Sequence, residues 1–390
     1  MALWNWCWNL GKRHDPEKIG IRLTKSGMDS LKTRSLLKTV RRVPAGHSTK
    51  IVFMKIQIWL CYILIACMCW VSCKEENAKG SPGVQVEKPR AKVPSFDKDS
   101  AYYYIEKQLS FGPRVPGSDA HKTCRDWLIE KFESFGAEVI RQDFIATIYT
   151  GDNLASSNII AQYNPNLKDR VILSAHWDSR FIAEQDADKS RREEAIPGAD
   201  DGGSGVAVLL EIARQLQSNP IDLGIDIILW DAEDQGQRGS QGSELSWCLG
   251  SQHWSQNKHK NKYQALYGIN LDMVGGKNPR FGMDAVSLYY APKVMNKIWK
   301  LARIMGYSDM FVEEKTGALM DDHKVVNEIA GIPMIDIINQ PTDTDTHFVE
   351  YWHTHDDDIS NIDKRTLKTV GQIVLATIYK ESDGSIASFE

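Results

Sequence analysis

Acidic and imidazole side chains gather at several points of the chain, and most of them follow directly after a short apolar run. The groups are His176-Trp177-Asp178, the glycine-rich stretch 198–205 with Asp201, the run Asp231-Ala232-Glu233-Asp234, Asp272, and the late His353. Two carboxylates and one imidazole are a normal ligand set for a catalytic zinc ion that keeps its fourth position open. An unligated glutamate beside such a site is free to move protons. The residue types therefore predict a zinc centre with its own acid–base group.

The pair Glu233-Asp234 is the strongest single indication of a bound cation. It places two carboxylates side by side at the end of an apolar strand, which costs free energy unless a positive charge compensates. Each acidic residue alone has an ordinary alternative as a helix cap or a turn residue, and Asp201 in particular could cap the helix that starts near Ser204. Their joint occurrence, in this order along the chain, favours the metal site.

The segments that must position these residues alternate between strand and helix. The spacing of apolar residues predicts helices over 118–135, 205–217 and 364–380, and strands over 171–175, 225–230, 267–271 and 333–338. This alternation predicts an α/β fold of three layers, with a mainly parallel central β-sheet and helices on both faces. Ligands of such sheets bind at the carboxyl ends of the strands. We therefore expect the polar groups to meet at one edge of the sheet.

Composition excludes several other classes of protein. The chain has 390 residues, of which 42% are apolar and 25% charged, as in a globular protein and unlike a disordered or fibrous one. The net charge of −4 argues against general binding to nucleic acid. Seven cysteines are too few for a disulfide scaffold, and whether Cys124 and Cys248 pair is left open by the sequence.

An export segment is predicted near the start of the chain. Residues 54–73 begin with Met54 and one lysine, continue with an uncharged apolar run, and end in a small residue before Cys73. This layout is typical of a bacterial lipoprotein signal, with the lipid on Cys73. Cys67 is an alternative lipid site. A membrane anchor helix is the alternative to a signal, although the run is short for crossing a bilayer.

These features divide the chain into four parts. Residues 1–53 hold eleven basic and three acidic residues, and we interpret them as an upstream extension from a mis-assigned start. A basic arm for nucleic acid or anionic lipid is the alternative for this part. Residues 74–95 are predicted to be a linker and residues 96–390 the catalytic zinc-dependent domain. The predicted location is the bacterial cell envelope, as an exported lipoprotein that faces the periplasm or the outside and is held to the membrane by its lipid alone.

The order of the motifs resembles the zinc-dependent aminopeptidase superfamily. Within it the sequence is most similar to the glutaminyl cyclases (glutaminyl-peptide cyclotransferases), specifically the bacterial relatives of the animal-type enzymes. The resemblance covers residues 98–381. Its most specific stretches are Phe-Gly-Pro-Arg-Val-Pro-Gly-Ser at 111–118, Ala-His-Trp-Asp-Ser-Arg at 175–180, Asp-Asp-His at 321–323 and Trp-His-Thr at 352–354.

This resemblance implies a zinc-dependent aminoacyltransferase. Such an enzyme converts the N-terminal Gln of peptides or proteins to pyroglutamate and releases ammonia. The resemblance implies one zinc ion per chain, held by Asp201, Asp234 and His353, with Asp234 standing where the animal enzymes usually have Glu. It also implies that Glu233 is the general acid and base.

Three further residues receive roles from the same resemblance. Asp272 and Asp322 are expected to form a carboxylate pair that shares a proton and holds the substrate amine. Trp352 is expected to line the pocket for the Gln side chain, and an ordinary core aromatic residue is the alternative reading.

Two other functions stay open at the level of sequence. His176, Asp201 and Asp272 could hold a second metal ion, which would make the protein a two-zinc aminopeptidase that releases N-terminal residues. A non-catalytic binding lipoprotein that kept the fold is the other alternative. Metal content separates the binding protein from both enzymes.

Overall fold

A computed structural model describes residues 90–239 and 243–389 of the chain. The predicted extension 1–53, the predicted signal 54–73 and all but the end of the predicted linker 74–95 lie outside the described residues. Within the described ranges, no helix combines the length and the apolar character that crossing a membrane requires.

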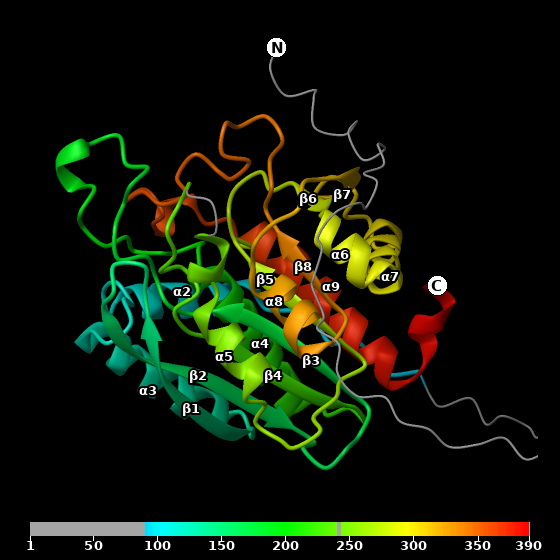
Figure 1. The fold of residues 1–390 in the computed structure, drawn as a ribbon. Coiled ribbons are helices and arrows are strands. Elements are labelled where there is room, and N and C mark those ends of the chain that lie inside the picture. Colours follow the sequence, from blue (N-terminus) through cyan, green and yellow to red (C-terminus); the bar gives the residue numbers. More distant parts are fainter. Residues whose placement is uncertain (1–89, 240–242, 390) are drawn as a thin grey trace, which may run out of the picture. The chain divides into compact units, whose positions relative to one another are not determined.

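A mixed sheet of six strands forms the centre of the fold, in the order β1-β2-β4-β3-β5-β8 (Figure 1). Its strands are β1 (Glu138–Thr147), β2 (Asn153–Tyr163), β3 (Arg170–His176), β4 (Gly224–Trp230), β5 (Tyr267–Asp272) and β8 (Met334–Ile338). The pairs β3–β4, β3–β5 and β5–β8 are parallel, whereas β1–β2 and β2–β4 are antiparallel. The four predicted strands are these four parallel ones, and the mainly parallel central sheet is confirmed.

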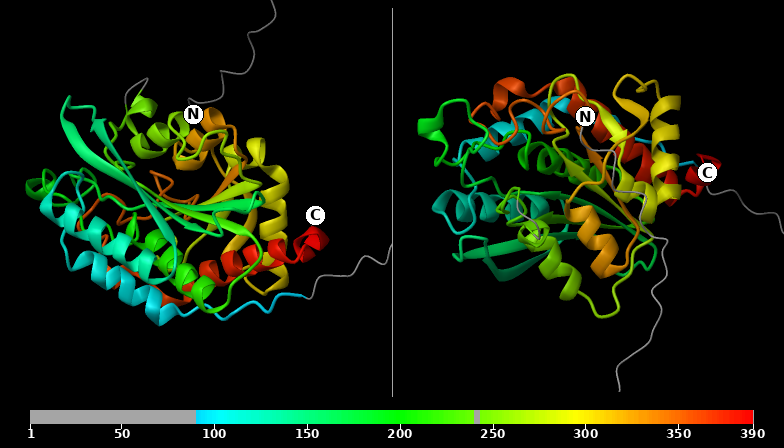
Figure 2. Two further views of the ribbon diagram at one scale, coloured as in Figure 1. Left: turned by 90° about the horizontal axis from the view of Figure 1, so that it is seen from below. Right: turned by 45° about the horizontal axis from the view of Figure 1, so that its top comes forward.

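Helices cover both faces of this sheet, so the predicted three layers are confirmed. The described α-helices are α2 (Lys98–Leu109), α3 (Asp119–Ser134), α4 (Gly203–Ser218), α5 (Leu249–Gln256), α6 (Ala285–Tyr290), α7 (Pro292–Ile304), α8 (Asp322–Val325) and α9 (Lys364–Ser382). Helices α2, α3, α4 and α9 lie on one face, and α5 and α8 lie on the other, as the left view of Figure 2 shows. A separate two-stranded sheet pairs β6 (Phe281–Met283) with β7 (Phe311–Lys315) beside α6 and α7.

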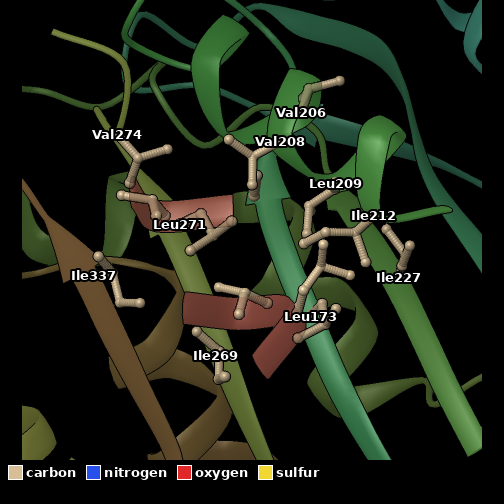
Figure 3. Close-up of a cluster of buried hydrophobic side chains, with 14 of the residues drawn as sticks. Leu173, Val206, Val208, Leu209, Ile212, Ile227, Ile269, Leu271, Val274 and Ile337 are labelled. Atoms are coloured by element: carbon tan, nitrogen blue, oxygen red, sulfur yellow. The ribbon is translucent and has the colours of Figure 1, made fainter. Parts of the chain in front are cut away.

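The main core lies between α4 and the sheet. Figure 3 shows Val208, Leu209 and Ile212 of α4 in one cluster with side chains of β3, β4 and β5. Burying a side chain of this size contributes about 1.5–3 kcal/mol. Alternate residues of the same strands, such as Ile172 and Ile228, point to the opposite face and pack in a second cluster. The strands are therefore apolar on both sides, as the short uninterrupted runs in the sequence indicated.

Both cysteines of the described residues are free and buried. Cys124 lies on α3, and Cys248 precedes α5 on the opposite face of the sheet. The question of their pairing is thereby answered: they do not form a disulfide.

Candidate active site

The carboxyl ends of the parallel strands bring the predicted polar residues together. His176 is the last residue of β3, Asp272 is the last residue of β5, and the run 231–234 follows β4 directly. His176 pairs in register with Trp230, the last residue of β4. The expected gathering of polar groups at one edge of the sheet is therefore what the strand register produces.

A glycine-rich turn carries Asp201 to this edge. Gly202 has a φ of +86°, and an added Cβ there would lie 2.6 Å from the carbonyl oxygen of Asp178. Gly205 is as tightly placed, since an added Cβ would lie 2.5 Å from the carbonyl oxygen of Leu271. Asp201 does not cap α4, whose N-cap is Gly202 with no side-chain hydrogen bond. The turn instead points the Asp201 carboxylate at Nε2 of His176, 2.8 Å away.

Asp201, Asp234 and His353 form a compact group of three buried donors. One ligand atom from each lies within 4.8 Å of the other two. Nε2 of His353 is 2.9 Å from Oδ1 of Asp234 and 3.7 Å from Oδ2 of Asp201. Nδ1 of His353 lies 2.8 Å from Oε1 of Glu184, which fixes the ring so that Nε2 faces the two aspartates. The residues that the sequence predicted as zinc ligands therefore converge on one point.

The chemistry of this group fits a zinc ion. Oδ2 of Asp234 is buried and has no hydrogen-bond partner among the residues that the structure describes. Burial, together with the charge of Asp201, raises the pKa of Asp234 to about 6. Two carboxylates that oppose each other's ionisation in this way are stabilised by a cation between them. A set of one imidazole and two carboxylates suits Zn²⁺.

A second group of donors shares Asp201 with the first. Nε2 of His176 lies 2.8 Å from Oδ1 of Asp201 and 3.3 Å from Oδ1 of Asp272, so the imidazole bridges the two carboxylates. These three residues also meet the geometric condition for holding a metal ion. Burial, with the charge of Asp201 adding to it, raises the pKa of Asp272 to about 8. The structure therefore offers two adjacent candidate metal sites, which share Asp201.

Glu233 lies beside the three donors, and hydrogen bonds to Asp178 fix its backbone. Its N–H donates to Oδ1 of Asp178 at 3.1 Å, and the N–H of Asp234 donates to Oδ2 of the same carboxylate at 3.2 Å. Oε1 of Glu233 accepts from the thiol of Cys248 at 3.2 Å, and Oε2 lies 4.0 Å from Nδ1 of His176. Burial raises the pKa of Glu233 well above its usual range. A carboxyl group with a raised pKa is suited to taking up and returning a proton near neutral pH.

The structure does not join Asp272 directly to Asp322. Oδ1 of Asp322 accepts from the hydroxyl of Ser251, and its Oδ2 is buried without a partner among the described residues. The neighbouring Asp321 lines the pocket instead, and its charge helps to raise the pKa of Asp272. The first turn of α8 places Oδ1 of Asp322 against Ser251 of α5, and the pair of Asp272 and Asp322 stays a prediction. A role for Asp322 in the reaction remains a prediction.

These residues surround a cavity of about 280 Å³. Glu233 and the two candidate aspartate ligands contribute to its lining, and so do the aromatic residues Trp247, Phe348 and Trp352. Trp352 is partly exposed here, so it is not a core residue, and its placement agrees with the expected role in the pocket. Its ring stacks on His353 with centroids 3.6 Å apart.

Other residues at the site were not found from the sequence. The ring of Trp247 lies nearly parallel to that of His353, with centroids 6.1 Å apart, and Asp321 lines the pocket beside Asp272. Asp178 belongs to the Ala-His-Trp-Asp-Ser-Arg motif at 175–180. Nothing in the sequence indicates, however, that it accepts hydrogen bonds from the backbone of residues 233 and 234. Asp231, in contrast, turns away from the pocket and bonds His121 at 2.9 Å.

Residues 158–378 match the model of peptidase family M28, and this stretch contains every site residue described above. The chain therefore belongs to peptidase family M28. Its fold is that of the zinc exopeptidases, as its structural neighbours include a Zn-dependent exopeptidase from Parabacteroides distasonis at 47% identity and a TM-score of 0.72, covering 74% of this chain and 99% of the other.

Two further relatives are a glutaminyl cyclase and an aminopeptidase. The structure of glutaminyl cyclase from Bacteroides thetaiotaomicron, bound to N-acetylhistamine, is 46% identical with a TM-score of 0.72 and covers 74% of this chain and 99% of the other. Aminopeptidase YwaD of Bacillus subtilis is 31% identical over 240 residues, which are 58% of this chain. The match spans 45% of the length of that aminopeptidase.

Proposed function

We propose that the protein is a glutaminyl-peptide cyclotransferase, which closes the N-terminal Gln of peptides or proteins into pyroglutamate and releases ammonia. The observation that carries this proposal is the combination of Glu233 with three converging donors beside a pocket that three aromatic side chains help to line. Its likeness to a bacterial glutaminyl cyclase over 99% of that chain supports the same activity.

One zinc ion per chain would be held by Asp201, Asp234 and His353. When bound, it supplies a Lewis acid for the side-chain carbonyl oxygen of the substrate Gln. The surrounding residues support this role, because Glu184 orients His353 and both aspartates line the pocket.

The chain's own residues orient the substrate and move one proton. The pocket holds the Gln side chain against the three donors, so that the α-amine of the same residue lies close to the side-chain amide carbon. Asp272 lines the pocket, and burial raises its pKa to about 8, which supports a role in hydrogen-bonding the uncharged amine. Trp352 and Phe348, stacked with centroids 4.5 Å apart, support the apolar part of the Gln side chain.

Ring closure forms one C–N bond and breaks another. The α-nitrogen attacks the side-chain amide carbon, and Glu233 accepts a proton from that nitrogen. Glu233 then returns the proton to the departing amide nitrogen, which leaves as ammonia. No water molecule is consumed, and the peptide keeps all its residues.

We further propose that the enzyme acts at the bacterial cell envelope, with its lipid on Cys73. The support is the sequence pattern of residues 54–73 and the Lys-, Glu-, Pro- and Gly-rich stretch that follows it. Replacing Cys73 by Ser is expected to release the protein from membranes, whereas a variant that stays bound would point to Cys67 or to an anchor helix.

A two-zinc aminopeptidase is the second candidate. It is favoured by the group His176, Asp201 and Asp272 and by the likeness to the Bacillus aminopeptidase. Metal analysis of the purified protein discriminates between them. One zinc per chain agrees with the cyclase, and two zinc ions with hydrolysis of peptides that lack Gln would establish the peptidase.

An ammonia-release assay on the purified full-length protein tests the cyclase directly. The substrate is a Gln-initiated peptide, and the control is the same peptide with an acetylated α-amine, which has no nucleophile for ring closure. Ammonia is expected from the first peptide alone. Ammonia from both peptides would indicate amide hydrolysis, and ammonia from neither would reject the proposed function.

A further inference from the structure

Cys248 has an unusual position for a buried thiol. It sits in the left-handed region with a φ of +57°, immediately before α5. Its side chain is fully buried, and its Sγ is 3.2 Å from Oε1 of Glu233. The only other cysteine of the described residues, Cys124, is buried in the main core away from the site.

The backbone around Cys248 is tied to the same turn that carries Glu233. The N–H of Cys248 donates to the carbonyl oxygen of Glu233 at 2.9 Å, and the N–H of Leu249 donates to that of Ala232 at 3.1 Å. The start of α5 and the turn after β4 therefore form one rigid unit. Within it the thiol is the group that reaches the end of the Glu233 side chain.

The electrostatic surroundings keep this thiol protonated. Burial raises the pKa of Cys248 well above its usual range, and the charges of Glu233, Asp322 and Asp321 raise it further. A neutral thiol has one weak donor hydrogen. Because Glu233 is the nearest acceptor, the thiol donates to it and does not act as a nucleophile.

We propose that Cys248 is the positioning residue for Glu233: its thiol holds Oε1, which leaves Oε2, 4.0 Å from Nδ1 of His176, as the oxygen that exchanges protons. This inference rests on the proposed function for its kinetic consequences, but not for the hydrogen bond itself. A weak donor suits the task, since it orients the carboxylate without competing strongly for the lone pairs that must accept the substrate's proton.

Kinetics of three variants test the proposal. In Cys248→Ala the carboxylate loses its orientation, so kcat is expected to fall about 10- to 100-fold with KM and zinc content unchanged. Cys248→Ser keeps a donor at the same place and is expected to recover most of kcat. Cys124→Ala is the matched control, because it removes a buried thiol far from the site, and its kcat is expected to stay at the wild-type value.

An infrared measurement tests the hydrogen bond independently of turnover. The difference spectrum between the full-length wild type and Cys248→Ser isolates the S–H stretching band of Cys248. In Glu233→Ala this band is expected to shift to the frequency of a thiol without an acceptor, while the band of Cys124 stays in place. This readout holds even for a protein without cyclase activity, so it separates failure of this inference from failure of the proposed function.

Three results would overturn the positioning role. The first is an S–H band of Cys248 that does not move in Glu233→Ala. The second is a Cys248→Ala variant that retains wild-type kcat. The third is a Cys248→Ala variant that loses both kcat and zinc while Cys248→Ser fails to recover kcat, because this pattern indicates a structural role.

Discussion

The carboxylate of Asp178 accepts hydrogen bonds from two successive backbone N–H groups, those of Glu233 at 3.1 Å and Asp234 at 3.2 Å. It also accepts from the side-chain amide of Gln235 at 2.9 Å. Asp178 follows β3, whereas the other residues follow the neighbouring β4. A residue at the end of one strand therefore fixes both the candidate acid–base group and a candidate zinc ligand at the end of the next.

Replacing Asp178 by Asn is expected to loosen this turn. The amide of Asn has one oxygen and one NH₂ group, so at least one of the two backbone N–H groups faces a donor and loses its partner. An unsatisfied buried donor costs about 1–3 kcal/mol. We expect a lower Tm together with lower kcat and weaker zinc retention, measured on the same preparation. Unchanged turnover in a folded variant would show that the turn holds its geometry without Asp178.

Glu233→Gln and Asp234→Asn are both expected to lose activity, but for different reasons. In Glu233→Gln the new side-chain amide cannot carry protons, so turnover should fall by about 10²–10⁴-fold while zinc and fold are retained. Asp234→Asn removes a charged ligand, so zinc content should fall together with activity. Metal analysis alongside kcat checks both variants. Equal loss of zinc in the two would mean that the acid–base group and the ligand have been assigned the wrong way round.

The roles of Asp321 and Asp322 can be distinguished by replacing each in turn with Asn, which has the same shape but no charge. Asp321 lines the pocket and acts on Asp272, whereas Asp322 is fully buried and accepts from Ser251. We expect Asp321→Asn to raise KM or lower kcat with zinc retained. For Asp322→Asn the main expected effect is on Tm, with a smaller effect on turnover. The reverse order of effects on turnover would support Asp322 as the partner of Asp272 in holding the amine.

A pH effect on stability is expected from His259, which lies far from the metal group. Burial lowers the pKa of His259 to about 4, and Nε1 of Trp254 donates to its Nδ1 at 3.0 Å. Because the folded pKa lies below the unfolded value of about 6.5, the stabilisation is complete above pH 6.5 and is lost as the pH falls to 4. The loss is at most about 3 kcal/mol.

His259→Gln is expected to remove this part of the pH dependence. Denaturant unfolding of wild type and variant between pH 7 and pH 4 measures the difference in stability at each pH, which cancels the contributions of all other groups. The free energy of unfolding of the variant, relative to that of the wild type, should rise as the pH falls. A difference that stays constant over this range would contradict a depressed pKa at His259.

The apolar runs of the sequence predicted the four parallel strands and the gathering of polar groups at their carboxyl ends, because both follow local rules. The choice of Asp201, Asp234 and His353 as ligands came from the resemblance to the glutaminyl cyclases. It could not place contacts set by tertiary packing. The thiol of Cys248 reaches Glu233 only because α5 docks against the turn after β4. Likewise, the choice between Asp321 and Asp322 depends on the direction in which α8 begins, and two adjacent aspartates carry no sequence signal for that direction.

The antiparallel strands β1 and β2 were also not predicted. Strand β1 is half exposed, and its mixed polar and apolar residues resemble a loop when read one by one. It pairs with the next strand, β2, through ten residue pairs across the ladder, and no apolar run in the sequence marks its position. The predicted site residues do not lie on β1 or β2. Missing these two strands therefore did not change which residues were predicted for the site.

The mass of a Gln-initiated peptide after incubation with the purified protein tests the central claim most directly. Ring closure removes one molecule of ammonia and leaves the chain length unchanged, and the Glu233→Gln variant should leave the peptide intact over the same time. We expect the pyroglutamyl peptide as the only product of the wild type. A peptide shortened by its first residue, with free Gln in solution, would contradict the cyclase and assign the protein to the aminopeptidases.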